Sequence, residues 1–507
     1  MLQVRPARVA PRDLAGLAAR LGVPAPARTA EVTGITHDSR DVRPGDVYAA
    51  LPGAHVHGAG FAREATDAGA VAVLTDPEGA ARCGEPRVPV LTVADPRAVL
   101  GGAASFVYGE PSRDLLLLGV TGTNGKTTTV FCLEAGLRAA GHRTGMAGTV
   151  VTRIGADSVP SIRTTPEATD LHALLATMRE RGVSAVAMEV SSHALVMGRV
   201  DGVEFDVAAF TNLSEDHLDF HHDLDDYFAA KARLFTPELA RRAVVCVDDV
   251  WGRRLAARAT VPVATCSIES ADADWQASDV DARPDGSRFR ITGPDGAYAD
   301  GGAALPGPFN VSNALLAVAT LATAGVPVEA AAAGVAAMPG VPGRMERVDA
   351  GQPFLAVVDY AHTPDAVEAL LRSLRTVTAG RLVVVLGCGG DRDRAKRPLM
   401  GAAAARLSDL AVLTSDNPRS ESATAILDQM AAGVATVPVP ERGEVRYDPD
   451  RRRAITAAVA AAAPSDVVVV AGKGHEQGQD IGGVVHPFDD RDVLRDALGH
   501  LSTRSIR

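Results

Sequence analysis

The chain has 507 residues, of which 46% are hydrophobic and 22% are charged, and its formal net charge is −11 at pH 7. One hydrophobic core does not organise a chain of this length, so about three domains of roughly 150 residues each are expected. The acidic balance, without a patch dense in Lys and Arg, argues against a nucleic-acid-binding protein.

Cysteine usage and hydropathy indicate a reducing compartment. The five cysteines show no C-x-x-C spacing and most lie in apolar runs, so they are interpreted as small core residues and not as disulfide or zinc partners. The N-terminal segment lacks the apolar core of a signal peptide, and no apolar run approaches the roughly 20 residues that span a bilayer. We therefore expect a cytoplasmic protein with no membrane contact.

In chain order, the first predicted region, residues 1–112, has a loose pattern that ends at the YGEPS stretch of residues 108–112. Short β-branched runs alternate with helical patterns from residue 113, and a second such alternation begins near residue 346. This alternation predicts parallel sheets covered by helices. The Pro- and Gly-rich residues 339–348 are interpreted as a linker. The predicted domains are therefore 1–112, 113–345 and 346–507.

A phosphate-binding loop is predicted at the start of the second region. The run LLLLGVTGTNGKTTTV, residues 115–130, places a buried-type strand before a Gly-rich turn, with Lys126 and Thr127 opening a helix. Glycines let backbone N–H groups approach an anion, and the helix N-terminus adds its positive dipole end. Lys126 would reach the β- and γ-phosphates and Thr127 would bind Mg²⁺. Val120 departs from the general GxxxxGK[ST] pattern, and a plain strand-to-helix turn is the alternative interpretation.

The variant TGTNGKTT resembles the ATP-dependent Mur ligases and their folylpolyglutamate synthetase relatives, which join a carboxylate to an amine. Eight further motifs match in order: MEVSSHAL (188–195), TNLSEDHLDFH (211–221), YFAAKARLF (227–235), GPFNVSNALLA (307–317), DYAHTPDA (359–366), GGDRDRAKRPLM (389–400), SDNPR (415–419) and GKGHE (472–476). They are most similar to the members that add diaminopimelate to UDP-N-acetylmuramoyl-L-alanyl-D-glutamate.

The resemblance implies a three-domain α/β fold. We expect the chain to act as a monomer. Residues 1–112 would bind the UDP-muramoyl substrate. Residues 113–345 would form a central P-loop-type parallel sheet with helices on both faces, which binds ATP. Residues 346–507 would form a Rossmann-like C-terminal domain, which binds the amino acid.

The chemistry explains why metal ligands and cations are expected. A carboxylate is a poor electrophile, and its phosphorylation by ATP brings two anions together, so Mg²⁺ and cations are needed where charge accumulates. The resemblance implies that Thr127 and Glu189 serve one Mg²⁺ and His217 a second. Without it, Glu189 is equally an exposed strand end and His217 a solvated loop residue. The residues implied for ATP are Thr121, Gly122, Thr123, Asn124, Gly125, Lys126, Thr127, Thr128 and Asn313.

Lysine is scarce in this chain: Lys126, Lys231, Lys396 and Lys473 stand against 47 arginines. Lys231 lies in a helical pattern, where Arg would serve equally well as a solvated cation, but Lys can lose its proton and become a nucleophilic amine. The resemblance implies that this amine reacts with CO₂ to give a carbamate that approaches Mg²⁺. Lys473, between glycines after a strand, is expected to face the site. For Lys396 a functional role and a solvated loop remain equally open.

Substrate-binding positions are implied by further matches. In the first domain THDSR (36–40) and LPGAHVHGAGF (51–61) resemble UDP-binding segments. Arg163 stands where relatives often have Asn. The residues implied for the UDP group are Ser39, His55 and Val56, and those for the muramoyl-dipeptide are Thr164, Thr165, Ser191 and Arg199.

The incoming amino acid is implied by SDNPR, which resembles the diaminopimelate-selective motif. Diaminopimelate carries a second carboxylate that Arg419 can grip bidentately, and lysine does not. Glu476 would accept the distal ammonium. Without the resemblance, Pro-Arg after a strand is a turn with a solvated Arg. The remaining implied pocket residues are Arg392, Asp416, Asn417, Pro418 and Gly472.

Two alternatives to a peptide-forming ligase are open. A folylpolyglutamate synthetase-like enzyme is disfavoured by the UDP-type segment and by SDNPR, and folate-dependent ADP formation would support it. A nucleotide-gated binding module would turn over ATP regardless of any amino acid, whereas the ligase releases phosphate only when acceptor and amine are both present.

Overall fold

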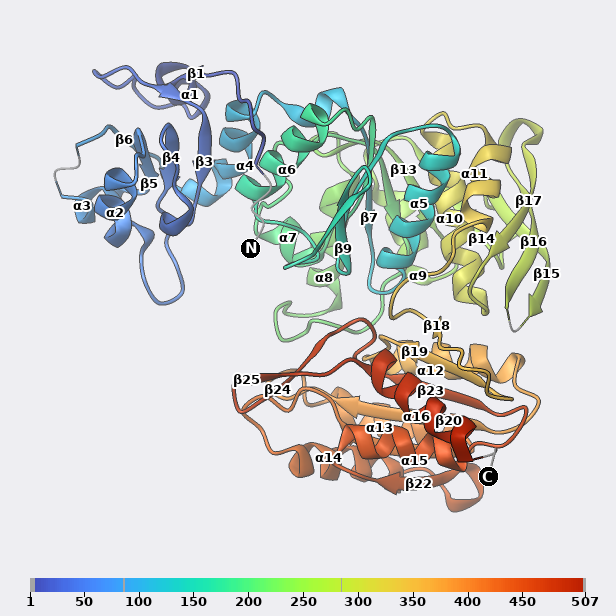
Figure 1. The fold of residues 1–507 in the computed structure, drawn as a ribbon. Coiled ribbons are helices and arrows are strands. Elements are labelled where there is room, and N and C mark those ends of the chain that lie inside the picture. The colour runs from blue at the N-terminus through green and yellow to red at the C-terminus, as the bar shows by residue number, and fades with distance from the viewer. Residues whose placement is uncertain (1–4, 85–86, 284, 505–507) are drawn as a thin grey trace.

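The structure, a computed structural model, describes residues 5–84, 87–283 and 285–504, and its strands form three main sheets in three spatially separate units (Figure 1). The N-terminal unit, in blue, lies beside the green and yellow central unit, and the orange and red C-terminal unit lies below. Within the described residues, no helix has the length and apolar content required to cross a membrane.

The N-terminal unit contains a four-stranded parallel sheet in the order β3-β4-β5-β6. Its strands have only three or four residues, which explains why the sequence pattern here is loose. They are β3 (Gly34–Thr36), β4 (Asp46–Ala49), β5 (Ala72–Thr75) and β6 (Val90–Thr92), and a two-stranded ribbon adds β1 (Arg12–Asp13) and β2 (Glu31–Val32). The helices are α1 (Leu14–Arg20), α2 (Ala62–Asp67), α3 (Pro77–Arg82) and α4 (Pro96–Val107).

The central sheet has eleven strands in the order β10-β9-β8-β11-β7-β12-β13-β14-β15-β16-β17. The strands from β8 to β15 are parallel, which confirms the predicted parallel sheet, but antiparallel strands extend both edges and were not predicted. The strands are β7 (Leu116–Thr121), β8 (Thr144–Ala147), β9 (Val151–Ile154), β10 (Asp157–Pro160), β11 (Ala185–Glu189), β12 (Phe205–Phe210), β13 (Ala240–Cys246), β14 (Val263–Ser267), β15 (Trp275–Arg283), β16 (Gly286–Thr292) and β17 (Tyr298–Ala303).

Helices cover both faces of the central sheet, as predicted. One apolar cluster packs α5, α10 and α11 against one face, and a second packs α6 to α9 against the other. The helices are α5 (Lys126–Ala139), α6 (Ala168–Glu180), α7 (Ser192–Val196), α8 (Leu224–Ala232), α9 (Val250–Arg258), α10 (Pro308–Thr323) and α11 (Val328–Ala336).

The C-terminal sheet has six strands in the order β18-β19-β23-β20-β21-β22, all parallel except β18. Helices α12 to α14 cover one face, and α15 and α16 cover the other. Its elements are β18 (Glu346–Arg347), β19 (Leu355–Asp359), α12 (Pro364–Thr376), β20 (Leu382–Cys388), α13 (Lys396–Leu407), β21 (Leu410–Ser415), α14 (Ala423–Ala435), β22 (Glu444–Tyr447), α15 (Arg451–Ala461), β23 (Val467–Ala471), β24 (Gly478–Ile481), β25 (Val484–Pro487) and α16 (Asp490–Arg504).

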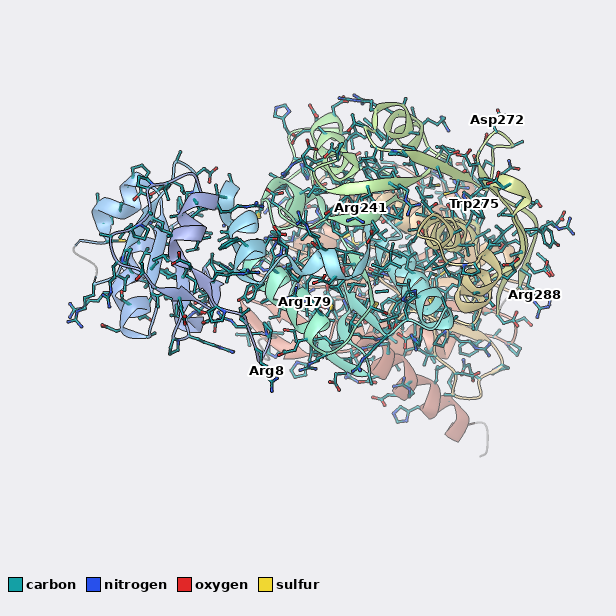
Figure 2. All side chains as sticks on the ribbon, turned by 90° about the horizontal axis from the view of Figure 1, so that it is seen from above. Arg8, Arg179, Arg241, Asp272, Trp275 and Arg288 are labelled. Atoms are coloured by element: carbon teal, nitrogen blue, oxygen red, sulfur yellow. The ribbon has the colours of Figure 1, made fainter. Side chains whose placement is uncertain are left out.

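Arg179, on α6, connects the first two units (Figure 2). Its guanidinium donates to the carbonyl oxygens of Tyr108 at 2.9 Å and Gly109 at 3.0 Å, and to the carboxylate of Asp114 at 3.0 Å. The segment predicted to join the first two domains is therefore fixed against the central unit by its backbone.

A fully buried ion pair ties the C-terminal unit together, and breaking it should be costly. Arg451 bonds both carboxylate oxygens of Asp490, at 2.7 and 2.6 Å, and neither side chain is exposed. We expect Asp490→Leu to lower the free energy of unfolding by about 3–5 kcal/mol, because it leaves a buried charge without its partner. Urea unfolding measures this. The control Arg452→Met, at an exposed neighbour, should change stability by less than about 0.5 kcal/mol; a similarly small loss in Asp490→Leu would contradict the prediction.

A buried histidine should make stability depend on pH. Burial lowers the pKa of His172 to about 4, below the value of about 6.5 in an unfolded chain. The unfolded state therefore binds the proton first as pH falls, and the free energy of unfolding should decline between pH 6.5 and 4 by up to roughly 3 kcal/mol. Urea unfolding across this range should show a flatter profile for His172→Gln. The exposed-site control His222→Gln should keep the wild-type slope, and equal slopes in all three proteins would refute the assignment.

Candidate active site

The predicted phosphate loop connects β7 to α5 and is held rigidly from the next strand. Thr211 Oγ1 donates to the Asn124 carbonyl at 2.6 Å, and Thr123 N donates to the Asn212 carbonyl at 2.9 Å. Gly122 has φ 149°, and a Cβ there would lie 1.8 Å from Thr211 Oγ1, so no larger residue fits. The loop is therefore preformed for close approach of an anion to its backbone.

Three other predicted ATP residues, Asn313, Thr121 and Thr128, lie around the loop. Asn313, on α10, is buried, and its Oδ1 lies 3.5 Å from Thr129 Oγ1. A Cβ at Gly125 would lie 2.3 Å from the same oxygen, so Asn313 closes the back of the loop. Thr121 and Thr128 are buried as well.

Lys126 folds back over this loop. Its Nζ donates to the carbonyl oxygens of Gly122 and Thr123, both at 2.8 Å. Burial lowers the pKa of Lys126, while the charges of Glu189 and Asp216 raise it. The Lys126 ammonium therefore interacts with the loop carbonyls through hydrogen bonds and with the Glu189 and Asp216 carboxylates through their charge.

Glu189 ends β11, as predicted, but it is not an exposed strand end. The residue is 1% exposed, and its carboxylate accepts hydrogen bonds from Thr149 N at 2.7 Å and Thr149 Oγ1 at 2.9 Å. A buried carboxylate costs free energy unless it is paired. A buried carboxylate that interacts with the charge of a lysine is typical of a functional site.

His217 lies in the loop after β12, as predicted, with a left-handed φ of 57°. Its backbone N–H donates to Asp216 Oδ1 at 2.9 Å, and its Nε2 lies 3.5 Å from Asp216 Oδ2. Burial lowers the pKa of His217, and the charge of Lys126 lowers it further, while Asp216 opposes the shift. A neutral imidazole is the form that binds a metal ion.

Lys231 is buried in full, so the solvated-cation alternative is wrong. The residue is 1% exposed, and its Nζ donates to the Gly122 carbonyl at 2.7 Å and lies 4.3 Å from the centroid of the Tyr227 ring. The same carbonyl accepts the Lys126 ammonium. Burial, and then the charge of Lys126, lowers the pKa of Lys231 well below its ordinary value. The lowered pKa favours the neutral amine, which is the nucleophilic form of lysine.

The residues around the loop could supply part of the coordination shell of Mg²⁺. Within the described residues, no three His, Cys, Asp or Glu side chains converge in a way that could hold a metal ion. Mg²⁺ commonly takes one or two protein oxygens and completes its shell with water and substrate phosphates. The buried carboxylate of Glu189 and the hydroxyl of Thr127 are donors of that kind.

Three of the four residues predicted for the muramoyl-dipeptide, Thr164, Thr165 and Ser191, lie around Glu189. Thr165 Oγ1 donates to the Glu189 carbonyl at 2.9 Å and accepts from Ser191 N at 3.1 Å. Thr164 Oγ1 lies 3.0 Å from Thr149 Oγ1, which itself bonds the Glu189 carboxylate. The structure thus brings this group of residues together.

The predicted arginines and the residues predicted for the UDP group do not contact Glu189 in the hydrogen bonds described above. Arg199 is buried and bonds Glu167 at 2.8 Å, whereas Arg163 is half-exposed. Ser39 begins a single 3₁₀ turn (Ser39–Asp41), and Val56 is 63% exposed. His55 is also exposed, so the UDP-side residues form an open surface in this structure.

A cleft with a volume of about 620 Å³ lies between the β9–β10 hairpin and the C-terminal unit. Three predicted pocket residues line it: Asn417, Arg419 and Glu476. Arg419 has a left-handed φ of 52°, its N–H donates to the Asp480 carbonyl at 3.0 Å, and its Nη1 donates to the Gly390 carbonyl at 2.6 Å. The arginine therefore enters the cleft from a turn fixed on both sides, not as a solvated turn residue.

Other predicted pocket residues do not line the cleft. Asp416 and Gly472 are not among its lining residues, and they pack against each other, since a Cβ at Gly472 would come 2.7 Å from Asp416 Oδ2. Pro418 forms the turn, and Arg392 is exposed. Lys473 was expected to face the site, but its side chain is wholly buried behind Asn417 and Glu476, so that prediction is wrong in this respect.

Sequence reasoning missed Arg344, which lies in the predicted linker. Its Nη2 donates to Thr127 Oγ1 at 3.4 Å, and its Nη1 lies 3.4 Å from His475 Nδ1. The guanidinium carbon lies 4.1 Å from the Tyr360 ring centroid. Arg344 thus joins the phosphate loop to the C-terminal unit. A charged residue in a Pro- and Gly-rich linker was the available signal.

Lys396, whose role was left open, begins α13, and its charge acts on Asp216 and His362. These two residues belong to different units, and Asp216 lies next to His217. Lys396 is therefore within electrostatic range of Asp216 and His362, and its role stays open.

Family models match all three units. The Mur ligase family catalytic domain matches residues 31–108, the Mur ligase middle domain matches 120–321, and the Mur ligase glutamate ligase domain matches 343–474.

Related proteins align over nearly the whole chain. UDP-N-acetylmuramoyl-L-alanyl-D-glutamate–2,6-diaminopimelate ligase of Streptomyces coelicolor is 61% identical over 97% of this chain and 98% of its own. UDP-N-acetylmuramyl-tripeptide synthetase of Leifsonia xyli is 44% identical over 98% and 97%. A solved structure of a UDP-N-acetylmuramoyl-L-alanyl-D-glutamate–2,6-diaminopimelate ligase has a TM-score of 0.67 and 33% identity, and covers 93% of this chain and 96% of its own.

Proposed function

This chain belongs to the Mur ligase family, and from that premise we propose that it adds diaminopimelate to the D-Glu γ-carboxylate of UDP-N-acetylmuramoyl-L-alanyl-D-glutamate. The reaction consumes ATP and supplies a peptidoglycan precursor. A carboxylate oxygen attacks the γ-phosphorus and ADP leaves. The amine nitrogen then attacks the acyl phosphate, and inorganic phosphate and a proton leave as the peptide bond forms.

The observation that carries this proposal is the connection through Arg344. One guanidinium nitrogen contacts Thr127 at the phosphate loop, and another lies beside His475, next to the cleft residue Glu476. A triphosphate on the loop and an amino acid in the cleft would therefore approach each other. Phosphoryl transfer from ATP to the D-Glu carboxylate brings two anions together and needs preorganised cations, and Arg344 and Lys126 supply them.

The phosphate loop and its neighbours take the binding roles. The loop N–H groups and Lys126 hold the triphosphate, and Asn313 keeps the loop in shape. Thr127 and Glu189 would hold one Mg²⁺ and His217 a second. The metal ions neutralise the negative charge that accumulates as the phosphoryl group is transferred.

Lys231 carries a carbamate in the active enzyme. Its neutral amine nitrogen attacks CO₂ and loses a proton, which turns a buried cation into an anion. Burial and the nearby charge of Lys126 favour the neutral amine needed for this step. Lys126 and Lys231 both donate to the Gly122 carbonyl, so two ammonium groups there would repel each other. A carbamate on Lys231 would instead attract the Lys126 ammonium.

The binding sites for UDP-muramoyl-dipeptide and diaminopimelate are spread over three domains. We propose domain boundaries at 1–112, 113–345 and 346–507. Ser39, His55 and Val56 line the UDP site, and Thr164, Thr165, Ser191 and Arg199 hold the muramoyl-dipeptide. In the third domain Arg419 binds the distal carboxylate of diaminopimelate. Asn417 and Glu476 line this pocket with it. Arg392, Asp416, Pro418 and Gly472 are assigned to its surroundings. Since one chain supplies every site, we place the reaction in a monomer, in the cytoplasm, where ATP is available.

Phosphate release from the purified chain tests the function. With Mg²⁺ and ATP, release should require both UDP-muramoyl-dipeptide and diaminopimelate, and omission of either should reduce it to background. Meso- and LL-diaminopimelate and L-lysine, offered in turn, would define the amine. Release that is indifferent to any amine would instead support a nucleotide-gated module, and release that depends on folate would support a folylpolyglutamate synthetase-like enzyme.

A further inference from the structure

The Lys473 ammonium lies buried behind the wall of the amino-acid cleft. Its side chain is 0% exposed, and its Nζ donates to Asn417 Oδ1 at 2.9 Å and to Glu476 Oε2 at 3.1 Å. Asn417 and Glu476 both line the cleft, and Lys473 does not. Lys473 can therefore act on a ligand through these two side chains and not by contact.

The ammonium fixes the orientation of the Asn417 amide. Asn417 Oδ1 accepts from Lys473 and also from the Asp480 backbone N–H at 3.0 Å. A flipped amide would direct its NH₂ group toward two donors, so the carbonyl oxygen must point inward. The amide NH₂ is then directed to Glu476 Oε2, which it reaches at 2.8 Å.

The same ammonium holds the Glu476 carboxylate. Both hydrogen bonds to that carboxylate engage Oε2, so Oε1 is the oxygen offered to a ligand in the cleft. Glu476 keeps 35% of its side-chain surface exposed, whereas its cationic partner has none. A carboxylate held this way on one side is preorganised to accept a ligand ammonium on the other.

The turn that carries Lys473 is closely packed. Gly472 and Gly474, on either side, have φ of 116° and 55°, and a Cβ on Gly474 would lie 2.7 Å from the Gly343 carbonyl oxygen. A compact ammonium fits between Asn417 and Glu476, whereas the planar fork of Arg needs more room. This accounts for a lysine here in a chain whose cations are otherwise almost all arginine.

We infer that Lys473 is a positioning residue that presets Asn417 and Glu476 for the ammonium of the incoming amino acid. The inference rests on the proposed function and deepens it. Arg419 recognises the distal carboxylate, and the Lys473-held pair recognises the distal ammonium at the same end of the substrate. Lys473 therefore sets the affinity for the amino acid without contributing to the binding of ATP.

Steady-state kinetics of Lys473→Met tests this inference. The KM for diaminopimelate should rise roughly ten- to a hundredfold, as expected for loss of hydrogen bonds from a charged group. The KM values for ATP and for UDP-muramoyl-dipeptide should stay within about twofold of wild type, a split that a purely structural defect does not produce. The control Arg446→Met, at an exposed position on β22, should leave all three KM values unchanged.

A double-mutant cycle separates positioning from direct binding. If Lys473 acts through Glu476, the KM of Lys473→Met/Glu476→Gln should rise by less than the product of the two single effects. Lys473→Gln, which keeps a hydrogen-bond donor, provides a second variant should Lys473→Met not fold. Multiplicative effects, an equal rise in the KM for ATP, an unchanged KM for diaminopimelate, or failure of both Lys473 variants to fold would each overturn the inference.

The wild-type protein distinguishes this failure from that of the proposed function. An active wild type with an unaffected Lys473→Met variant overturns the role of Lys473 alone. A wild type without diaminopimelate-dependent phosphate release overturns the proposed function, and this inference with it.

Discussion

Lys231→Arg should lose ligase activity by at least roughly 10²–10³-fold, the range seen when one preorganised electrostatic group is removed. Arginine keeps the positive charge but does not lose its proton, so it cannot react with CO₂. Phosphate release with all substrates present measures the loss.

Three measurements separate the carbamate from simple misfolding. Thermal unfolding and ATP binding of Lys231→Arg should remain close to those of wild type. In ¹³C-bicarbonate, the wild type should show a carbamate signal by NMR that the variant lacks. Removal of dissolved CO₂ should lower wild-type activity, and bicarbonate should restore it. A fully active Lys231→Arg protein would remove the carbamate from the mechanism.

Arg419→Ala should reduce kcat/KM for diaminopimelate roughly 30-fold or more, which corresponds to a loss of about 2–5 kcal/mol of transition-state stabilisation. The reason is that the distal carboxylate would enter the cleft without its cationic partner. The Arg419 backbone is held by Asp480 and by the β24–β25 hairpin, so truncation of its side chain leaves the turn in place. L-Lysine has no distal carboxylate, so its use should change little. The preference for diaminopimelate over lysine should therefore fall.

Competition between the two amino acids measures this preference. The control Arg372→Ala removes an exposed arginine on α12 of the same unit and should preserve it. An Arg419→Ala protein that still prefers diaminopimelate as strongly as wild type does would refute the assignment of Arg419.

Much of the fold follows from sequence patterns because its sheet cores are parallel. The buried runs of β7, β11 and β23 are nearly continuous in apolar residues, as strands covered on both faces must be. The antiparallel extensions escaped prediction where their residues are polar and exposed: β10 reads DSVP, and most of β15, which pairs antiparallel with β16, faces solvent. Such strands are fixed by pairing with neighbours and not by their own hydropathy.

The candidate site was predictable only where residue type itself carries information. Lysine scarcity singled out Lys231, and a strand end singled out Glu189. The partners that give these residues their properties lie elsewhere in the chain: Thr149 holds the Glu189 carboxylate from 40 positions away, and Gly122 accepts the Lys231 amine across 109. Neither contact leaves a local pattern. Lys473 shows the same limit, since its burial depends on Asn417, 56 positions earlier.

The central claim is that ATP activates the D-Glu carboxylate as an acyl phosphate on this chain. Its most direct measurement uses UDP-muramoyl-dipeptide with ¹⁸O in both oxygens of that carboxylate, followed by mass spectrometry of the released phosphate. Each inorganic phosphate formed should contain one ¹⁸O atom, since the oxygen that bridges carbon and phosphorus leaves with phosphorus. Peptide product accompanied by phosphate without label would contradict it.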